Sequence, residues 1–407
     1  MKGFINPRYP MSNRNMKLDS PRYKIKGEMS PFDERDNVHA RYELEADTFE
    51  WESFYRQHPG WEKEDLKTKA FPGIGRVGNE RDLPMLWSQR EILHKLGSEA
   101  MVDGSVSDIK QEINPARAAE KIKGFARHLG ADLVRIGPLN QAHVYTHVGK
   151  TVHCPEKERD SPISLSHKHA ISLAVGSNVN LIKTGPVLSE IMEMMRVYTI
   201  LAKASATLAS YIRHLGYSAR AHNLRNYLVL CIPIAIDAGI GELSRMGILI
   251  SKEFGPCLKL ATVTTDLPMD YDPPVDIGVE EFCEDCKICA ESCPSGAIPH
   301  GDRVAVRGVE KWKIKPEACF RVWCETGTDC GVCISSCPWT KPGTLFHNLM
   351  KEIATRMGNS GLNLFQSGWK CRITPFGKNI KNCGNISSFH PEMVLFRNME
   401  TDRLWTL

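Results

Sequence analysis

Two long stretches of the chain repeat apolar residues with the spacing of a helix, and each is followed by a short apolar run. The first stretch starts at Asn114-Pro115, an N-cap residue followed by proline at the first helical position, and stops at Gly130. Its apolar stripe is Ala119, Ile122, Ala126 and Leu129. The second stretch extends from about Leu188 to Leu215 and stops at Gly216. We predict two helices here, followed by strands at 131–136 and 217–221.

The two predicted helices end in similar sequences, which suggests two comparable helix–strand units. The first ends Phe125-Ala-Arg-His-Leu-Gly130 and the second ends Tyr211-Ile-Arg-His-Leu-Gly216. A further strand is predicted from Leu258 into a turn at Thr265–Pro268, followed by a linker at 270–274. The succession of helices and strands predicts an α/β core.

Residues 1–90 lack such a pattern, because they are polar and interrupted by proline and glycine. We predict an extended arm with one short helix at 48–57, which packs its aromatic residues on the rest of the chain. Gly73-Ile-Gly75-Arg-Val-Gly78 matches the dinucleotide-binding pattern G-x-G-x-x-G, which requires a strand before it and a helix after it. Phe71-Pro72 precedes it instead. An irregular loop is the favoured interpretation.

The composition is that of an ordinary globular protein, and it narrows the function classes. Among 407 residues, 42% are hydrophobic and 25% are charged. The net charge is +4, from 52 basic and 48 acidic residues, which is too balanced to suggest nucleic acid as a partner. No run of about 18 apolar residues is present, and residues 1–10 show neither the apolar stretch nor the twin arginines of an export signal. We therefore expect either a cytosolic protein or a processed chain.

The 14 cysteines change this picture, because eight of them form two groups that each end in proline. The first group has the spacing of bacterial iron–sulfur proteins, in which three cysteines bind one cluster and the fourth binds the other. A zinc site or a disulfide framework is the disfavoured alternative, since zinc takes four ligands and a chain of this size needs no disulfides. The groups are Cys283-x-x-Cys286-x-x-Cys289-x-x-x-Cys293-Pro294, and Cys319 followed by Cys330-x-x-Cys333-x-x-x-Cys337-Pro338.

We predict two [4Fe–4S] clusters whose fourth ligands cross over. The first cluster takes Cys283, Cys286, Cys289 and Cys337, and the second takes Cys319, Cys330, Cys333 and Cys293. Ten residues separate Cys319 from Cys330, and Cys324 among them is a rival ligand. We favour Cys319. The other cysteines are scattered, which indicates free thiols and a reducing or anaerobic setting.

A glycine-rich block upstream of the cysteines has two interpretations. It reads Ala238-Gly-Ile-Gly-Glu-Leu-Ser-Arg-Met-Gly247. It is either a corner where backbone passes close to backbone, or a place where a large planar cofactor approaches the chain. Five histidines between residues 143 and 169 include His143 and His147, four positions apart. We expect no metal site there, because the surrounding stretch is rich in polar residues and proline.

Together these motifs resemble the corrinoid-dependent reductive dehalogenases of the organohalide-respiring type. The resemblance covers about residues 95–345. Epoxyqueuosine reductase belongs to a related family, but it more often has Gly-Trp-x-Gly-Lys where this chain has Glu242 and Arg245. The motifs that carry the resemblance are, in order, Leu215-Gly-Tyr217, Ala238-Gly-Ile-Gly-Glu242-Leu-Ser-Arg245, Thr265-Asp-Leu-Pro268, the first cysteine group, and Gly327-Thr-Asp-Cys330 to Trp339.

The resemblance implies a nitroreductase-like α/β core that binds a corrinoid base-off, with an inserted bacterial ferredoxin domain that holds two clusters. The common corrinoid motif Asp-x-His-x-x-Gly is absent, because His94-x-x-Gly97 has isoleucine at position 92, and this agrees with the dehalogenases. The implied domains are an N-terminal arm (1–94), the corrinoid-binding core (95–275), the ferredoxin-like domain (276–345) and a C-terminal segment that completes the core (346–407). A short helix is predicted around 346–357.

The implied reaction replaces the carbon–halogen bond of a small chlorinated alkane or alkene by carbon–hydrogen, with electrons passing through the clusters to a cob(I)amide. It needs a proton donor, which in similar enzymes is a tyrosine beside a cation that favours phenolate. Among the matching residues, Tyr198 is the donor with Tyr211 as its rival, Lys259 is the cation, and Asn223, with Asn226 close by, contacts substrate or corrinoid. The candidate corrinoid contacts are Gly239, Gly241, Glu242, Ser244 and Arg245.

The resemblance also implies partners and a location. The partners are a halogenated hydrocarbon, a respiratory electron donor and a small membrane-anchor protein, and nucleic acid is not among them. The location is the outer face of the cytoplasmic membrane, which assumes a removed export signal; a cytoplasmic location is the alternative. Two other functions remain open: an epoxyqueuosine-reductase-like enzyme acting on tRNA, and a ferredoxin-type electron carrier. The body of about 180 residues before Cys283 argues against the carrier.

Overall fold

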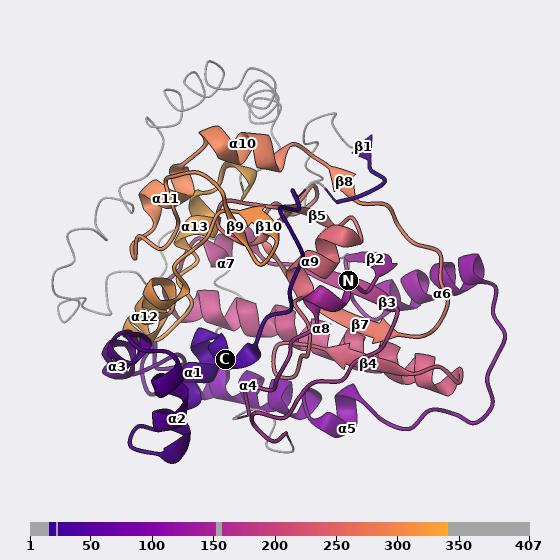
Figure 1. Ribbon diagram of the computed structural model, residues 1–407, viewed down its shortest axis with the longest axis horizontal. Helices are drawn as coiled ribbons and strands as arrows, with labels where there is room; N and C mark the ends of the chain where they lie inside the picture. Colours follow the sequence, from indigo (N-terminus) through magenta and orange to yellow (C-terminus); the bar gives the residue numbers. More distant parts are fainter. Residues whose placement is uncertain (1–15, 22, 152–156, 341–407) are drawn as a thin grey trace. The chain divides into compact units, whose positions relative to one another are not determined.

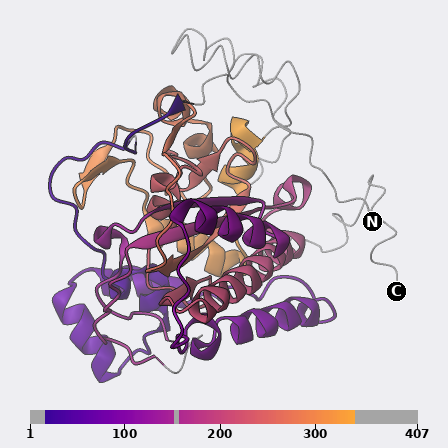
Figure 2. The same cartoon turned by 90° about the vertical axis from the view of Figure 1, so that its right-hand side faces the viewer.

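The computed structural model describes residues 16–21, 23–151 and 157–340, all within one compact unit, Met1–Phe365. Figures 1 and 2 show this part of the chain from two directions. The predicted helix around 346–357 and the predicted segment 346–407 lie outside the described residues. No helix among the described residues combines the length and the apolar character that crossing a membrane requires.

An antiparallel sheet of four strands forms the centre of the core. Its order is β2 (Leu133–Pro138), β3 (His169–Gly176), β7 (Leu258–Thr265) and β4 (Ala219–His222). The strands predicted at 131–136 and 217–221 are β2 and β4, each about two residues later than predicted, and they form the two edges of the sheet. The predicted strand from Leu258 is β7, next to the centre. Sequence analysis missed β3, which pairs with both β2 and β7.

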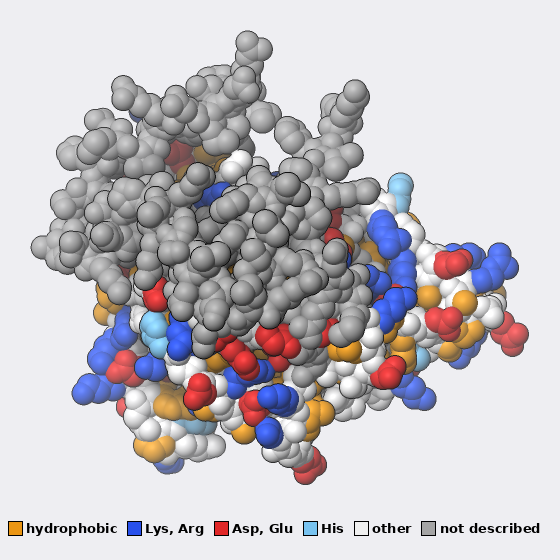
Figure 3. Space-filling model, turned by 90° about the horizontal axis from the view of Figure 1, so that it is seen from above, with side chains coloured by type: hydrophobic (Ala, Val, Ile, Leu, Met, Phe, Trp, Pro, Cys, Tyr) orange, Lys and Arg blue, Asp and Glu red, His pale blue; other side chains and the backbone are white. Residues whose placement is uncertain are grey.

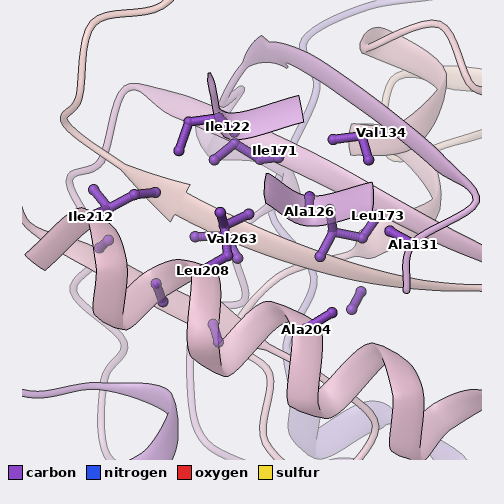
Figure 4. Packing of buried hydrophobic residues seen from close by; sticks show 14 of the residues in the cluster. Ile122, Ala126, Ala131, Val134, Ile171, Leu173, Ala204, Leu208, Ile212 and Val263 are labelled. Atoms are coloured by element: carbon purple, nitrogen blue, oxygen red, sulfur yellow. The ribbon is translucent and has the colours of Figure 1, made fainter. Parts of the chain in front are cut away.

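The two predicted long helices lie on one face of this sheet, because their apolar residues join the same strand residues in one core, part of which Figure 4 shows. α6 (Pro115–His128) is capped by the Asn114 side chain, and α8 (Leu188–His214) ends, like α6, at a glycine with positive φ. Their apolar stripes pack on alternate strand residues, because successive strand side chains point to opposite faces. The residues that meet in this core include Ile122, Ala126, Val134, Ile171, Leu173, Ala204, Leu208, Ile212 and Val263.

Two further helices extend the layers on either side. α4 (Leu83–Leu96) packs against α8 through Leu86 and Leu93, both fully buried. α9 (Cys231–Asp237) covers part of the opposite sheet face and packs Ala235 and Ile236 against Ala174. The long helix α8 therefore has the sheet on one side and α4 on the other.

From Glu34 on, the N-terminal region is mostly helical, so the prediction of an extended arm is wrong there apart from its one helix. That helix is α2 (Phe49–Gln57), capped by the Thr48 side chain. The arm prediction rested on the polar, glycine- and proline-broken sequence, yet short helices form between those breaks. They are η1 (Glu34–Asp36), α1 (Val38–Glu43), α3 (Trp61–Lys69), α4 and α5 (Glu99–Val102).

The cysteine-rich segment folds into short helices and one hairpin. α12 (Pro316–Thr326) packs against α3 and α1 of the N-terminal region, which lie beside it in Figure 1. The segment's other elements are α10 (Val279–Asp285), α11 (Ile288–Ser292), β9 (Val304–Val306), β10 (Val309–Lys311), α13 (Val332–Ser336) and η3 (Pro338–Thr340). The remaining short elements are β1 (Met16–Lys17), η2 (Gln141–His143), α7 (Val179–Ile182), β5 (Gly241–Leu243), β6 (Leu249–Ser251) and β8 (Val275–Asp276).

Candidate functional site

The first predicted cysteine group comes together from three elements. Cys283 lies in α10, Cys289 lies in α11, and Cys337 directly precedes η3. Burial raises the pKa of the Cys283 thiol to about 12, and the Cys286 thiolate adds to the effect. The pKa of Cys337 is raised well above its usual value, first by burial and then by Cys283, Cys289 and Cys286. Each ionised thiol in this group makes it harder for its neighbours to lose a proton. A bound metal cation overcomes this effect, because it deprotonates the thiols that coordinate it, so the group is suited to binding iron.

The second predicted group comes together around α12 and α13. Burial raises the pKa of Cys319 to about 12, and the charges of Cys330 and Cys293 act in the same direction. The pKa of Cys333 is also raised, first by burial and then by the charges of Cys330, Cys319 and Cys293. The structure therefore brings Cys293 to the second group and Cys337 to the first, in the crossed arrangement expected from the spacing.

Cys324 points away from the second group. Cys319 and Cys324 are five residues apart on α12, which turns them about 140° from each other on the helix surface. The Cys324 thiol meets the Tyr42 hydroxyl and the charge of Lys69 instead, and burial raises its pKa to about 11. This geometry favours Cys319 as the ligand.

No three His, Cys, Asp or Glu side chains in the described part of the chain are spaced to hold a single metal ion. A four-iron cluster is larger than one ion, and its four cysteines stand correspondingly farther apart. The finding therefore concerns single-ion sites. His143, one of the five histidines between residues 143 and 169, is buried and lies 3.0 Å from Asp237, measured between Nε2 and Oδ2.

Glu242 anchors the start of the cysteine-rich segment. Its buried carboxylate accepts hydrogen bonds from the backbone N–H groups of Ile277 (2.6 Å) and Val279 (2.7 Å), and longer ones from Gly278 and Glu280. These are the unpaired donors at the N-terminus of α10, where a negative charge is also favoured by the helix dipole. Glu242 thus fixes the helix that carries Cys283.

Arg245 anchors the same segment through carbonyl oxygens. Its fully buried guanidinium donates to the oxygens of Cys283 (2.9 Å), Glu284 (3.0 Å), Pro299 (3.0 Å) and Gly301 (2.9 Å). The guanidinium also lies over the Trp312 ring, 4.6 Å from its centroid, which is within the range of a cation–π contact. The corrinoid contacts predicted for Glu242 and Arg245 remain predictions, and the structure shows what else these side chains do.

The glycines of the same block lie where backbone approaches backbone. A Cβ on Gly239, which has φ +81°, would lie 2.2 Å from the carbonyl oxygen of Pro273. A Cβ on Gly241 would lie 2.1 Å from that of Ile250 on the paired strand β6, where Ser251 is the residue directly opposite Gly241. The Ser244 hydroxyl donates to the carbonyl of Ile248 at 2.7 Å. Of the two interpretations of this block, these contacts favour the corner of close-packed backbone.

Tyr198 and Lys259, far apart in the sequence, meet between α8 and the sheet. Lys259 shares the sheet face of Ala261 and Val263, which packs against α8. Its Nζ lies 5.7 Å from the centroid of the Tyr198 ring. Burial raises the pKa of Tyr198 above its usual value of 10, while the Lys259 charge acts in the opposite direction. Burial lowers the pKa of Lys259, but the charges of Tyr198 and Asp329 outweigh it, so the pKa is raised.

Tyr211, the rival donor, occupies a different environment. It packs against the core beneath α6, and its ring meets the Phe125 ring edge-on at 5.3 Å. Asn223 is buried in a tight turn, where its Oδ1 accepts from the Arg225 backbone N–H at 3.2 Å and its backbone exchanges two 3.0 Å bonds with Asn226. The predicted contact of Asn223 with substrate or corrinoid remains untested beside this structural role.

Two carboxyl groups near Lys259 were missed by sequence analysis. Burial raises the pKa of Glu190 to about 8, with the Asp329 charge as the next cause, and burial also raises the pKa of Asp329. Asp329 precedes Cys330 in the Gly327-Thr-Asp-Cys330 motif, a position that could have suggested it. Glu190 lies one turn into α8, where the pattern shows nothing beyond a polar residue.

An open pocket of about 650 Å³ lies elsewhere, along the loop that leads into β3. Its lining includes Gln141, Leu165, His167 and Lys168, and none of the cysteines, Tyr198 or Lys259 contributes to it. We place the candidate reaction site at Tyr198 and Lys259, because the chemistry-bearing side chains converge there.

Comparison with protein families and curated proteins agrees with this arrangement. Residues 282–341 match the family described as "4Fe-4S dicluster domain". The chain is 27% identical over 355 residues to a tetrachloroethene reductive dehalogenase of Sulfurospirillum multivorans, covering 76% of this chain and 70% of that protein. It is 30% identical over 283 residues to one from Desulfitobacterium hafniense, covering 59% and 51%. A more distant match, 26% identical over 168 residues, is an epoxyqueuosine reductase of Aliivibrio fischeri, covering 40% and 43%.

Among solved structures, a catabolic reductive dehalogenase matches with a TM-score of 0.72 at 23% identity, covering 90% of this chain and 50% of that one. This likeness shows the fold. The predicted fold class, an α/β core joined to an iron–sulfur domain for two clusters, is confirmed by the structural match and the family model. The chain spans about half the length of most of the relatives named here.

Proposed function

We propose that this chain, a relative of the reductive dehalogenases, replaces the carbon–halogen bond of a small organohalide by carbon–hydrogen. The observation that carries the proposal is the Tyr198–Lys259 pair, which lies beside the second cysteine group: the charge of Cys333 is among those that act on Lys259. A protonated phenol with a cation at hand, next to an electron-transfer centre, can supply the proton that this reduction consumes.

The eight cysteines of the two groups would hold two [4Fe–4S] clusters, which supply one-electron transfer. Cys293 belongs to the first group in the sequence but would bind the second cluster, and Cys337 belongs to the second group but would bind the first. Each group would therefore contribute backbone to both cluster sites. Cys333 of the second group is among the charges that act on Lys259, and we propose that the second site lies nearer the reaction.

Tyr198 would donate the proton. Burial keeps its phenol protonated at neutral pH, and Lys259 stabilises the phenolate left after the transfer. The Asp329 carboxylate favours the charged form of the Lys259 ammonium. The partly buried position of Tyr198 also limits the access of water, which would otherwise compete as a proton source.

A corrinoid would have to lie on the α8 side of the sheet, within reach of Tyr198. Glu190, buried near Lys259, has a carboxyl oxygen without a hydrogen-bond partner among the described residues. The amide groups on a corrinoid's rim would satisfy that oxygen. A bound corrinoid supplies cobalt, which as cob(I)amide is a two-electron reductant.

The substrate class, the partners and the location extend this proposal. Two relatives are named for tetrachloroethene, and we propose a chlorinated ethene or alkane. The electrons would come from a respiratory donor, and a small anchor protein would hold the enzyme at the outer face of the cytoplasmic membrane, with a cytoplasmic location as the alternative. We also propose the division of the chain into the domains 1–94, 95–275, 276–345 and 346–407.

The second candidate is an enzyme of the epoxyqueuosine-reductase type, favoured by the more distant match. Such an enzyme would bind tRNA, whose phosphates attract a basic surface. On the described surface visible in Figure 3, Lys and Arg side chains are interspersed with Asp and Glu. We therefore rank the organohalide reaction first.

The test is an anaerobic assay of the chain loaded with iron, sulfide and cobalamin. With a reduced viologen dye, we expect halide release from chloroethenes or chloroalkanes, coupled to oxidation of the dye. A tRNA stem-loop that carries epoxyqueuosine serves as the competing substrate. Conversion of the tRNA without halide release would contradict the proposal and support the second candidate.

A further inference from the structure

Three arginines between Tyr198 and the protein surface form no ion pair with any Asp or Glu of the described residues. They are Arg225, Arg90 and Arg76. The contrast with other buried arginines is sharp. Arg41 pairs with Asp65 at 2.9 Å, and Arg220 pairs with Asp103 at 2.8 Å. Arg225 and Arg90 are partly buried, and the Asp329 charge acts on Arg225 without coming within ion-pair distance. A partly buried cation without an ion pair is costly, so the run suggests an anion that the chain itself does not supply.

Arg225 is the arginine nearest the reaction site. Its neighbour Leu224 and Tyr198 pack in the same apolar cluster between α4 and α8. Gly97, at the end of α4, lies directly against its stem: a Cβ there would be 2.5 Å from the Arg225 Cβ. The Arg225 Nε is buried and has no hydrogen-bond partner. Burial and the Arg90 charge lower the pKa of Arg225 to about 10, so it stays charged at neutral pH.

Arg90 continues the run along α4. It lies seven residues before Gly97, about 10 Å along the helix axis. Its guanidinium lies against Gly75, where a Cβ would meet NH1, and its one hydrogen bond goes to the carbonyl of Ile74 at 3.4 Å. His94 is one turn away on the same side of α4, and burial together with Arg225 and Arg90 lowers its pKa to about 4, so the imidazole is neutral.

Arg76 brings the run to the surface. Its side chain is exposed, whereas Arg90 and Arg225 are partly buried. Its loop is fixed, because the N–H groups of Gly75 and Arg76 both donate to the carbonyl of Gly327, at 2.7 and 3.2 Å. The glycines of the Gly73–Gly78 loop thus have a use unrelated to a dinucleotide: Gly75, with φ +89°, leaves room for the Arg90 guanidinium.

The proposed reaction produces one anion for every turnover, since R–X, two electrons and one proton give R–H and X⁻. A halide left in a dry site would hold back the next cycle, because an unpaired buried charge is unfavourable. We propose that Arg225, Arg90 and Arg76 form a path that binds the halide released beside Tyr198 and carries it to solvent. This inference rests on the proposed function. Successive cationic positions allow an anion to move on from each, as in anion-selective pores.

The test measures chloride binding to the cluster-loaded chain. Binding is monitored by the line width of the chlorine NMR signal, and gluconate replaces chloride so that the ionic strength stays constant. We expect broadening that saturates with protein in the wild type. Arg225→Gln and Arg90→Gln should each weaken binding about ten- to hundredfold, the range of hydrogen bonds to charged groups. Arg225→Lys should retain most of it. Arg81→Gln, an exposed arginine just before α4, is the control and should change nothing.

If Arg90→Gln fails to fold, Arg76→Glu places an opposing charge at the surface end and should weaken binding severalfold. Equal broadening in wild type and Arg225→Gln would overturn the inference, and so would an equal loss in Arg81→Gln. The measurement needs no turnover. If the chain dehalogenates but its chloride binding does not depend on Arg225, the halide path is wrong and the proposed function stands. If chloride binding depends on Arg225 but the chain releases no halide from organohalides, the proposed function is wrong.

Discussion

The cysteine-rich segment and the Tyr198 site represent two ways in which a chain assembles chemistry. All eight predicted cluster ligands lie between Cys283 and Cys337, at spacings that follow from the shape of the cluster. The Tyr198 site draws on α8, β7 and the residue before Cys330, and its members meet only after the sheet forms. A local motif shows its ligands in the sequence, whereas a site built on a scaffold shows them only when the fold is known.

The two regions also differ in how their charges are balanced. Glu242 and Arg245 are saturated by backbone groups of the cysteine-rich segment, which fixes that segment to the core. Around Tyr198, by contrast, Lys259 faces a phenol and buried carboxyl groups, and Arg225 forms no ion pair with the described residues, although the Asp329 charge acts on it. The first arrangement gives rigidity, and the second leaves charge available for a reaction.

The largest expected effect tests the local side of this comparison. Cys319→Ala should lose one cluster, and with it about half of the bound iron and nearly all turnover, because its thiolate has no substitute in the second group. Cys324→Ala should keep both clusters, since its thiol faces Tyr42. Iron and sulfide content measured under anaerobic conditions checks both variants. Loss of iron from Cys324→Ala alone would exchange the two assignments.

The junction between the regions is tested by Glu242→Gln, which removes the charge that holds the start of α10. We expect a loss of about 2–4 kcal/mol in the free energy of unfolding, because four backbone donors lose a buried carboxylate. Urea unfolding with iron content as a second probe measures it. Glu284→Gln is the matched control. It breaks only an exposed pair with Arg303 and should cost about 1 kcal/mol or less. Equal losses in the two variants would show that Glu242 is not an anchor.

The smallest effect concerns the core itself and its dependence on pH. His222 is fully buried between Thr264, 2.9 Å from its Nε2, and the Leu228 N–H, which donates to its Nδ1 at 3.1 Å. Burial, and then the Arg220 charge, lower its pKa well below the usual 6.5. The unfolded chain therefore binds a proton that the folded chain refuses, so stability is full above pH 6.5 and falls as the pH drops below it.

This loss amounts to at most about 1.4 kcal/mol per pH unit for each such histidine. In His222→Gln, the difference in unfolding free energy between pH 7 and pH 5 should shrink by about 1–2 kcal/mol. His214→Gln, at an exposed position, should leave the difference unchanged. An unaltered pH dependence in His222→Gln would mean that this imidazole takes up its proton as readily in the folded protein as in the unfolded chain.

How far the sequence led can be judged from particular elements. Helix ends were predictable where a single side chain decides them, as with Thr48 and Asn114 at N-caps and Gly130 and Gly216 beyond C-termini. β3 was missed because it is buried on both faces, so its apolar run lacks the alternation of a half-exposed strand. α4 was missed because exposed Trp87, Met85 and Ile92 blur its apolar stripe.

The same division holds within the candidate site. The cysteines were assigned from spacing, and the structure groups them in the same way. Glu242 and Arg245 were singled out by their motif, but only tertiary contacts reveal that they hold the cysteine-rich segment. Glu190 and Arg225 carry no local pattern, because their roles depend on burial and on distant neighbours, whereas Asp329 lies within a motif next to Cys330. Resemblance to a family could point to Tyr198 and Lys259, while their meeting at 5.7 Å is a property of the fold.

The most direct test of the account is turnover of the fully loaded chain with Tyr198→Phe against Tyr211→Phe. Both variants remove one hydroxyl from α8, but only Tyr198 lies beside Lys259. We expect Tyr198→Phe to keep its iron and its bound corrinoid and to lose about a hundred- to ten-thousandfold in halide release, the usual contribution of a proton donor. Tyr211→Phe should turn over at nearly the wild-type rate. Wild-type halide release by Tyr198→Phe would contradict the assignment of the proton donor, and with it the location of the reaction site.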